Sequence, residues 1–219
     1  MSFWKQFEPA TCLPDNCNCE LVRDAFIRQP SAFWSSFSYL AVSLATVYLI
    51  KHHSTQLRNW AFVCFVMGLS SLFGHMSFTR FSLAIDISSI ILVMTFFPVS
   101  HFTSKKGLSK LQTFSIFIVF YISLFIGIYH LEKWPKVFLC IVVFTFVLKD
   151  SFRFKATEVR LKDLNKSLFI LFFSFALFLL DEFHIGCNPE SLLQLHSLWH
   201  LGTALSMYFY GKWRLNEGF

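Results

Sequence analysis

The chain has 219 residues, of which 55% are hydrophobic and only 15% are charged. Soluble domains carry about 25% charged residues. The composition, which includes 30 phenylalanines, therefore excludes an ordinary soluble domain and predicts an all-α membrane protein. The net charge of +6 comes from Lys and Arg in short segments between apolar stretches, a pattern typical of membrane loops. No nucleic-acid-binding motif is present, so we expect no nucleic-acid partner.

The first residues of the chain differ from the rest in having no continuous apolar core. They also lack a small-residue cleavage site, so we do not expect a cleavable signal peptide. We predict an extramembrane N-terminal segment at 1–30, a domain of membrane spans at 31–212 and a cytoplasmic tail at 213–219.

Seven apolar segments follow one another along the chain, and they predict a seven-transmembrane helix bundle. A helix needs about 20 residues to cross the hydrocarbon core, and the fifth segment is short for that purpose. The charged stretch Asp150–Asn165 is predicted to be a solvated loop. The seven predicted spans are Ser31–His52, Asn59–Phe78, Ser82–Phe102, Leu111–His130, Pro135–Lys149, Leu164–Phe183 and Glu190–Lys212.

Four ionisable side chains interrupt the apolar segments: His75, Asp86, His196 and His200. Ionisable residues inside membrane spans are costly, so each is a candidate for function. With the N-terminus outside, all four lie toward the outer face of the membrane. A single membrane histidine more often serves packing or hydrogen bonding, and Asp86 alone also fits a residue at the end of a span that reaches water.

His196 and His200 are four residues apart, which places them one turn apart on the same face of a helix. Two imidazoles at this spacing can bind one metal ion, and His75 is available from another span as a third ligand. Three histidines and one open position are typical of catalytic zinc. Ser71 shares the helix face of His75, although alone it also fits a helix-packing residue.

Together these residues resemble a known family of membrane enzymes. The pattern Ser71-x-x-x-His75, followed by Asp86 and by His196-Ser-Leu-Trp-His200 in the last span, resembles the alkaline ceramidase family. That family belongs to a superfamily of seven-span hydrolases that includes the adiponectin-type receptors and the Per1-like proteins. The motifs Cys19-Glu20 and Cys187-Asn188-Pro189 resemble those of bacterial ceramidase-like members.

The resemblance implies a role for each candidate residue. His75, His196 and His200 would bind zinc, Asp86 would orient or deprotonate the attacking water, and Ser71 would help to stabilise the oxyanion. The implied activity is hydrolysis of the amide bond of ceramide or a related N-acyl lipid. The implied location is a bacterial inner membrane, or the endoplasmic reticulum or Golgi of a eukaryote, with the protein as a multi-pass membrane protein.

The N-terminal segment departs from the family pattern. Animal alkaline ceramidases bind calcium there through several acids, and bacterial members keep a Glu where this chain has Gln29. Only Glu20 matches an expected carboxylate, so calcium binding is doubtful and at most weak. We expect a disulfide between Cys19 and Cys187 instead, because it would tie this segment to the loop before the last span.

Other interpretations stay open at the level of sequence. Cys12, Cys17 and Cys19 would be the ligands of a second metal site if they were reduced. The zinc chemistry also fits a lipid esterase or phospholipase of the same superfamily. A non-catalytic receptor-like bundle with a structural metal, or a haem protein with histidine ligands, would use the same histidines.

The orientation of the bundle follows from its cations. With the N-terminus outside, 13 of the 19 Lys and Arg residues lie on the inside and 6 on the outside, so we predict an N-out, C-in arrangement. A reporter fused after Phe219 should therefore read as cytoplasmic. A periplasmic or lumenal signal from that reporter would contradict the predicted topology.

Overall fold

The fold of the described residues is entirely helical, as the composition predicts. No strand occurs among them, and the only bridge between extended residues joins Pro9 to Thr79. The computed structural model describes residues 3–10, 12, 18–50, 55–131, 141, 145 and 158–216.

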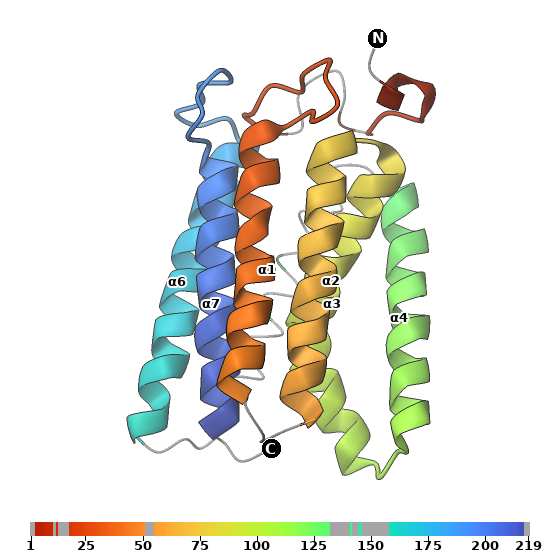
Figure 1. The fold of residues 1–219 in the computed structure, drawn as a ribbon, viewed down its shortest axis with the longest axis vertical. Coiled ribbons are helices and arrows are strands. Elements are labelled where there is room, and N and C mark those ends of the chain that lie inside the picture. Colours follow the sequence, from red (N-terminus) through yellow and green to blue (C-terminus); the bar gives the residue numbers. More distant parts are fainter. Residues whose placement is uncertain are drawn as a thin grey trace.

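The long helices lie side by side along the long axis of the molecule (Figure 1). The N-terminal segment and the loop before the last helix lie together at one end, and the C-terminus lies at the other end. The helices are η1 (Phe3–Gln6), α1 (Pro30–Ile50), α2 (Thr55–Ser77), α3 (Arg80–Lys105), α4 (Lys110–His130), α6 (Glu158–Glu182) and α7 (Leu195–Asn216).

Each predicted span other than the fifth coincides with one of these helices. The first four of them begin and end within four residues of the observed helices. The fifth predicted span, Pro135–Lys149, lies almost wholly outside the described residues. The last two differ at their N-terminal ends, for different physical reasons.

The predicted loop Asp150–Asn165 is wrong in its second half, because α6 already begins at Glu158. The charged residues of this second half, from Glu158 to Asp163, lie in the first turns of the helix, whereas 150–157 lie outside the described residues. One of them, Asp163, lies 3.4 Å from the ammonium group of Lys212 on α7. A polar helix end that pairs with its neighbour can extend beyond the apolar part of a span, and hydropathy alone does not reveal such an extension.

The last predicted span begins too early, because α7 starts at Leu195 and not at Glu190. The buried side chain of Gln194 explains this difference. Its amide group donates hydrogen bonds to the carbonyl oxygens of Ser191 at 2.6 Å and Asn188 at 3.0 Å. The segment before α7 is thus a polar turn held by Gln194.

Four described helices are long and apolar enough to cross a membrane, namely Thr55–Ser77, Arg80–Lys105, Lys110–His130 and Leu161–Glu182. α7 is less apolar than these four, and both α1 and α7 carry many polar side chains. Eight residues of α1 have hydroxyl groups: Ser31, Ser35, Ser36, Ser38, Tyr39, Ser43, Thr46 and Tyr48.

These hydroxyl groups join α1 to its neighbours inside the bundle. Tyr39 on α1 shares a hydrogen bond of 2.8 Å with Thr203 on α7, and Ser43 donates one of 2.8 Å to the carbonyl of Ala61 on α2. Hydroxyl groups commonly link helices in this way in membrane proteins. The hydroxyl groups of α1 therefore serve its contacts with α2 and α7.

A two-residue turn connects α2 to α3. Phe78 takes a positive φ of 49°, which is unfavourable for a bulky residue, but its side chain is buried. Thr79 caps α3 through a hydrogen bond from the backbone N–H of Ser82. Because the turn is so short, His75 and Asp86 lie near the same end of adjacent helices.

The N-terminal segment is also attached to α3 and α4. Glu8 accepts hydrogen bonds from the guanidinium of Arg80 and from the hydroxyl of Tyr129. The bond from Arg80, more than that from Tyr129, lowers the pKa of Glu8 below its usual value. The segment therefore covers the end of the bundle at which α3 begins.

The expected disulfide between Cys19 and Cys187 is confirmed, with Cα atoms 5.5 Å apart. Cys12 is disulfide-bonded as well. A second metal site formed by Cys12, Cys17 and Cys19 is therefore contradicted, because a sulfur atom in a disulfide is no thiolate ligand. Cys64 is free and buried.

The disulfide gives a prediction for stability. Cys187→Ser should lower the midpoint of thermal unfolding in detergent, because native disulfides of small secreted domains contribute about 2–5 kcal/mol. The double variant Cys19→Ser/Cys187→Ser should be destabilised by the same amount, since both changes remove one bond. Additive effects of the two changes would show that the cysteines act independently.

Candidate metal centre

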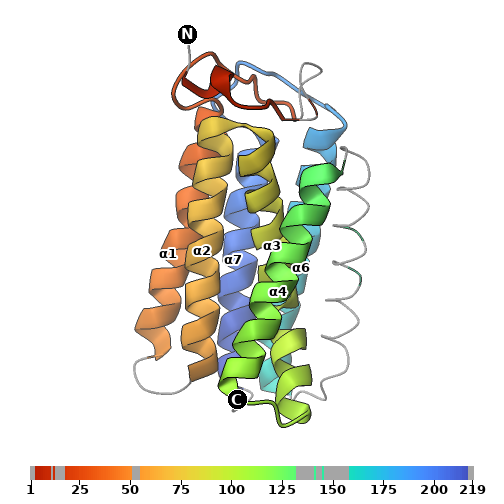
Figure 2. The same cartoon turned by 90° about the vertical axis from the view of Figure 1, so that its right-hand side faces the viewer.

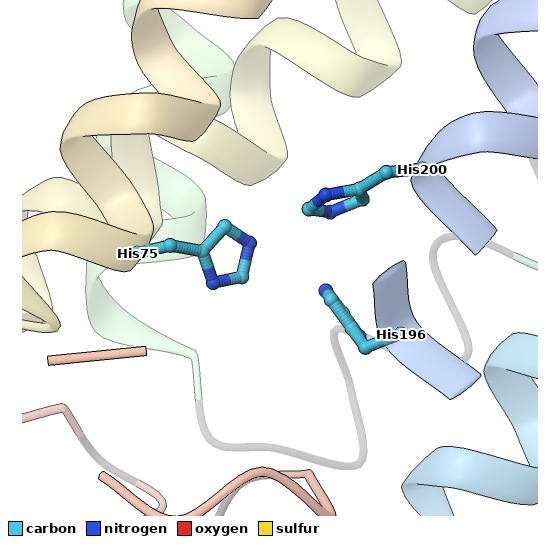
Figure 3. Close-up of side chains that lie close together, drawn as sticks. All are labelled: His75, His196 and His200. Atoms are coloured by element: carbon cyan, nitrogen blue, oxygen red, sulfur yellow. The ribbon is translucent and has the colours of Figure 1, made fainter. Parts of the chain in front are cut away.

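Three histidines converge inside the bundle, close to the end that carries the N-terminal segment. His75 comes from α2, and His196 and His200 come from the first turns of α7, so that their rings point toward one another (Figure 3). The ring centres lie 4.8–5.1 Å apart. One nitrogen from each ring lies within 4.8 Å of the other two, which is close enough for small side-chain rotations to bring all three to one ion.

The Nδ1 atoms of two of these histidines contact groups from α1 and the segment before it. His75 Nδ1 lies 2.8 Å from the side-chain oxygen of Gln29. His200 Nδ1 lies 2.9 Å from the hydroxyl of Ser35 and 3.2 Å from the carbonyl oxygen of Ala32. Because an amide or carbonyl oxygen can only accept, Nδ1 carries the proton in both rings and Nε2 is left as the ligand atom.

The third histidine is held by a carboxylate. His196 Nδ1 lies 3.3 Å from Asp181 Oδ2, and Asp181, on α6, is fully buried. Metal-bound histidines characteristically donate their second ring N–H to a carboxylate or a carbonyl, which fixes the ring and increases its basicity. All three histidines thus have the surroundings of metal ligands.

Sequence reasoning missed Asp181, although a signal for it exists. Asp181 is an acid at the end of an apolar helix, at the same end of the bundle as the histidines. Asp181 is followed directly by Glu182, and two adjacent acids at the end of an apolar stretch are typical of a helix end exposed to water. Only the contact between α6 and α7 shows that Asp181 points inward.

Gln29 stands at a position where the resemblance predicts an acid. In the structure it is fully buried, and its amide group donates to Asn18 Oδ1 at 2.5 Å and to the carbonyl of Glu20 at 3.2 Å. These two bonds orient the amide so that its oxygen faces His75. Gln29 therefore connects the N-terminal segment to the histidine cluster.

Glu20, the candidate calcium ligand, caps helix α1. Its two carboxylate oxygens accept hydrogen bonds from the backbone N–H groups of Ser31 at 2.7 Å and Ala32 at 3.0 Å. Burial raises the pKa of Glu20, and these two backbone donors oppose that effect. A carboxylate at a helix N-terminus stabilises the helix without any cation. The expectation that Glu20 binds calcium at most weakly stays a prediction.

Asp86 and Ser71, the predicted catalytic residues, lie beside the cluster. Asp86 Oδ2 is 3.8 Å from His75 Nε2, and Ser71 donates a hydrogen bond to Asp86. Gly74 allows this close approach of α2 and α3, because a Cβ atom at that position would lie 3.0 Å from Asp86 Cβ. Ser71 also shares a hydrogen bond of 2.9 Å with Ser36 on α1.

The remaining described histidines are not part of this group. His101, His130 and His184 are exposed. His52 and His53 lie outside the described residues.

The donor set of the cluster matches a divalent cation. His75 Nε2 and Asp86 Oδ1 are buried and have no hydrogen-bond partner among the described residues. Three neutral imidazoles with a doubly charged ion would be balanced in charge by the two carboxylates of Asp86 and Asp181. A buried charge needs such compensation, so the metal would satisfy the polar atoms that the fold leaves unpaired.

The chain matches no protein-family profile, no curated protein and no solved structure.

The contact with His196 predicts a specific effect of Asp181→Asn. The neutral amide would support the imidazole less well, so affinity for metal should fall about 10–100-fold. Metal-free protein titrated with Co²⁺ and followed by visible absorption measures this affinity without any enzymatic assay. Glu182→Gln is the matched control, because it removes a neighbouring acid from the same helix end. Equal losses in both variants, or no loss in Asp181→Asn, would contradict the role of Asp181.

Proposed function

We propose that this protein is a zinc-dependent hydrolase of the membrane that cleaves the amide bond of ceramide or a related N-acyl lipid. The observation that carries this proposal is the cluster of His75, His196 and His200 with Asp86 beside it. The three histidines can bind a metal ion, and the carboxylate of Asp86 can exchange protons beside them. Both lie inside a bundle of apolar helices.

Zinc is the metal that this donor set suits best. Three histidine nitrogens with one open position form the ligand set of several zinc hydrolases. Bound zinc lowers the pKa of a water molecule to about 7 and polarises a carbonyl group, so that an amide can be attacked at neutral pH. Nδ1 of His75 and of His200 donates a hydrogen bond to an oxygen, which leaves the usual Nε2 atoms free as ligands.

The chain's own residues would perform the proton transfers and bind the developing charge. Asp86 is placed to accept a proton from the attacking water and to pass it to the leaving amine. Ser71 contacts Asp86 and Ser36, and its hydroxyl can donate to the oxyanion of the tetrahedral intermediate. Both residues lie close to His75, where the scissile carbonyl would bind.

The substrate class follows from the surroundings of the site. Phe178 and Trp199 lie with their ring centres 5.2 Å apart on the α6–α7 side of the cluster, and Phe178 is 6.4 Å from His196. An apolar bundle of this kind suits a substrate with long hydrocarbon chains. The choice of an amide over an ester rests on the resemblance to alkaline ceramidases, which extends from Cys19-Glu20 to His200.

The arrangement in the membrane is part of the same proposal. Seven spans with the N-terminus outside would place the histidine cluster toward the outer face. The disulfide at that end of the bundle supports this orientation, because the periplasm and the lumen of the secretory pathway are oxidising.

In this proposal Asp86 and Ser71 act in the chemical step and do not bind the metal. Asp86→Asn and Ser71→Ala should keep their zinc and lose most of their turnover of an N-acyl lipid. Loss of one oxyanion donor typically costs about 10²–10³ in rate. Ser70→Ala is the matched control for Ser71→Ala, because Ser70 is also buried on α2 but contacts Tyr121. Release of fatty acid, followed by mass spectrometry, gives the turnover.

Unchanged turnover in Asp86→Asn would remove this residue from the mechanism. Turnover of lipid esters but not of amides would favour an esterase or phospholipase of the same superfamily. Zinc binding without turnover of any lipid would favour a receptor-like protein.

A further inference from the structure

We propose that a groove between α2, α3 and α4, separate from the histidine cluster, binds the acyl chain of an anionic phospholipid. α2 and α4 both pack against α3 (Figure 2), and the groove between them has a volume of about 370 Å³. This volume lies within the range of about 300–1,000 Å³ that is typical of small-molecule sites.

The walls of the groove are apolar and elongated. On α3, the residues Leu92, Phe96 and Ser100 line it at successive turns, and on α4 the lining runs from Thr113 to Tyr121. Eight residues of helix span about 12 Å. A narrow apolar channel of this length suits a hydrocarbon chain better than a compact ligand.

The two ends of the groove differ in polarity. Asn59, Ser100 and Thr113 lie at one end, in the first turns of α2 and α4 and near the end of α3. The opposite end closes at Tyr121, whose hydroxyl is bonded to Ser70. A lipid would therefore place its polar headgroup at the end that is remote from the histidine cluster and direct its chain toward Tyr121.

The charges at the polar end determine which headgroup fits. Arg58, Lys105 and Lys110 are exposed at this end of the three helices. Asp86 is the only acid in the sequence between Ala25 and Leu131, so no carboxylate neutralises these cations from within the three helices. Basic pockets between membrane helices characteristically bind anionic lipid headgroups.

The same cations also follow from the general excess of positive charge on inner loops, which requires no binding site. The two explanations differ in one measurable respect. A specific lipid-binding site needs both the groove and the cations, whereas a non-specific attraction of anionic lipids depends on the cations alone.

Native mass spectrometry of the full chain in detergent separates these cases, with phosphatidylglycerol and phosphatidylcholine of identical chains as the probes. Wild-type protein should retain one phosphatidylglycerol in preference to phosphatidylcholine. Arg58→Gln/Lys110→Gln should weaken phosphatidylglycerol binding by about 10-fold to 30-fold at low ionic strength. Lys162→Gln/Lys166→Gln removes equal charge from α6 and should leave binding unchanged.

A second pair of variants tests the groove itself. Ile118→Trp places a large side chain in the groove and should abolish retention of the lipid, whereas Val119→Trp changes the next residue of α4, which does not line the groove, and should not. Equal binding of the two lipids by wild type would overturn the proposal. Equal losses in the α6 control, or undiminished binding in Ile118→Trp, would do the same.

Discussion

The structure depends on the burial of ionisable side chains among apolar helices. His75, His200 and Asp181 are almost completely shielded from solvent, and Asp86 is only 5% exposed. Removing such groups from water is costly unless hydrogen bonds or opposite charges compensate them. Other elements of the bundle supply the hydrogen bonds and the opposite charges that these buried groups need.

Three elements of the fold supply partners to the buried histidines. α1 supplies hydroxyl and carbonyl groups to His200, α6 supplies Asp181 to His196, and the N-terminal segment supplies Gln29 to His75. The disulfide from Cys19 to Cys187 joins that segment to the turn before α7, so two of these contributions are tied together. His75 Nε2 is among the buried atoms that still have no hydrogen-bond partner in the described part of the chain, and a divalent cation bound by the three histidines would give it one.

The sequence predicts most of the helices and the candidate residues of the histidine cluster well, for a simple reason. An apolar stretch of about 20 residues indicates a membrane helix, and an ionisable residue within it is conspicuous, so His75, Asp86, His196 and His200 are found without a structure. The supporting contacts are not predicted, because they join distant parts of the chain. Gln29 and His75 are separated by 46 residues, and the inward direction of Asp181 depends on how α6 packs against α7. Polar helix ends, such as Glu158–Asn165, also resemble loops when only hydropathy is considered.

The claim that the three histidines form a zinc site has a direct test. The protein, purified without added chelator, is analysed for metal content and by X-ray absorption at the zinc edge, together with the variant His196→Ala/His200→Ala. We expect one zinc per chain in the wild type, coordinated by three imidazole nitrogens at about 2.0–2.1 Å, and a loss of that zinc in the variant. Equal zinc in both proteins, or sulfur ligands in the wild type, would contradict the proposed site.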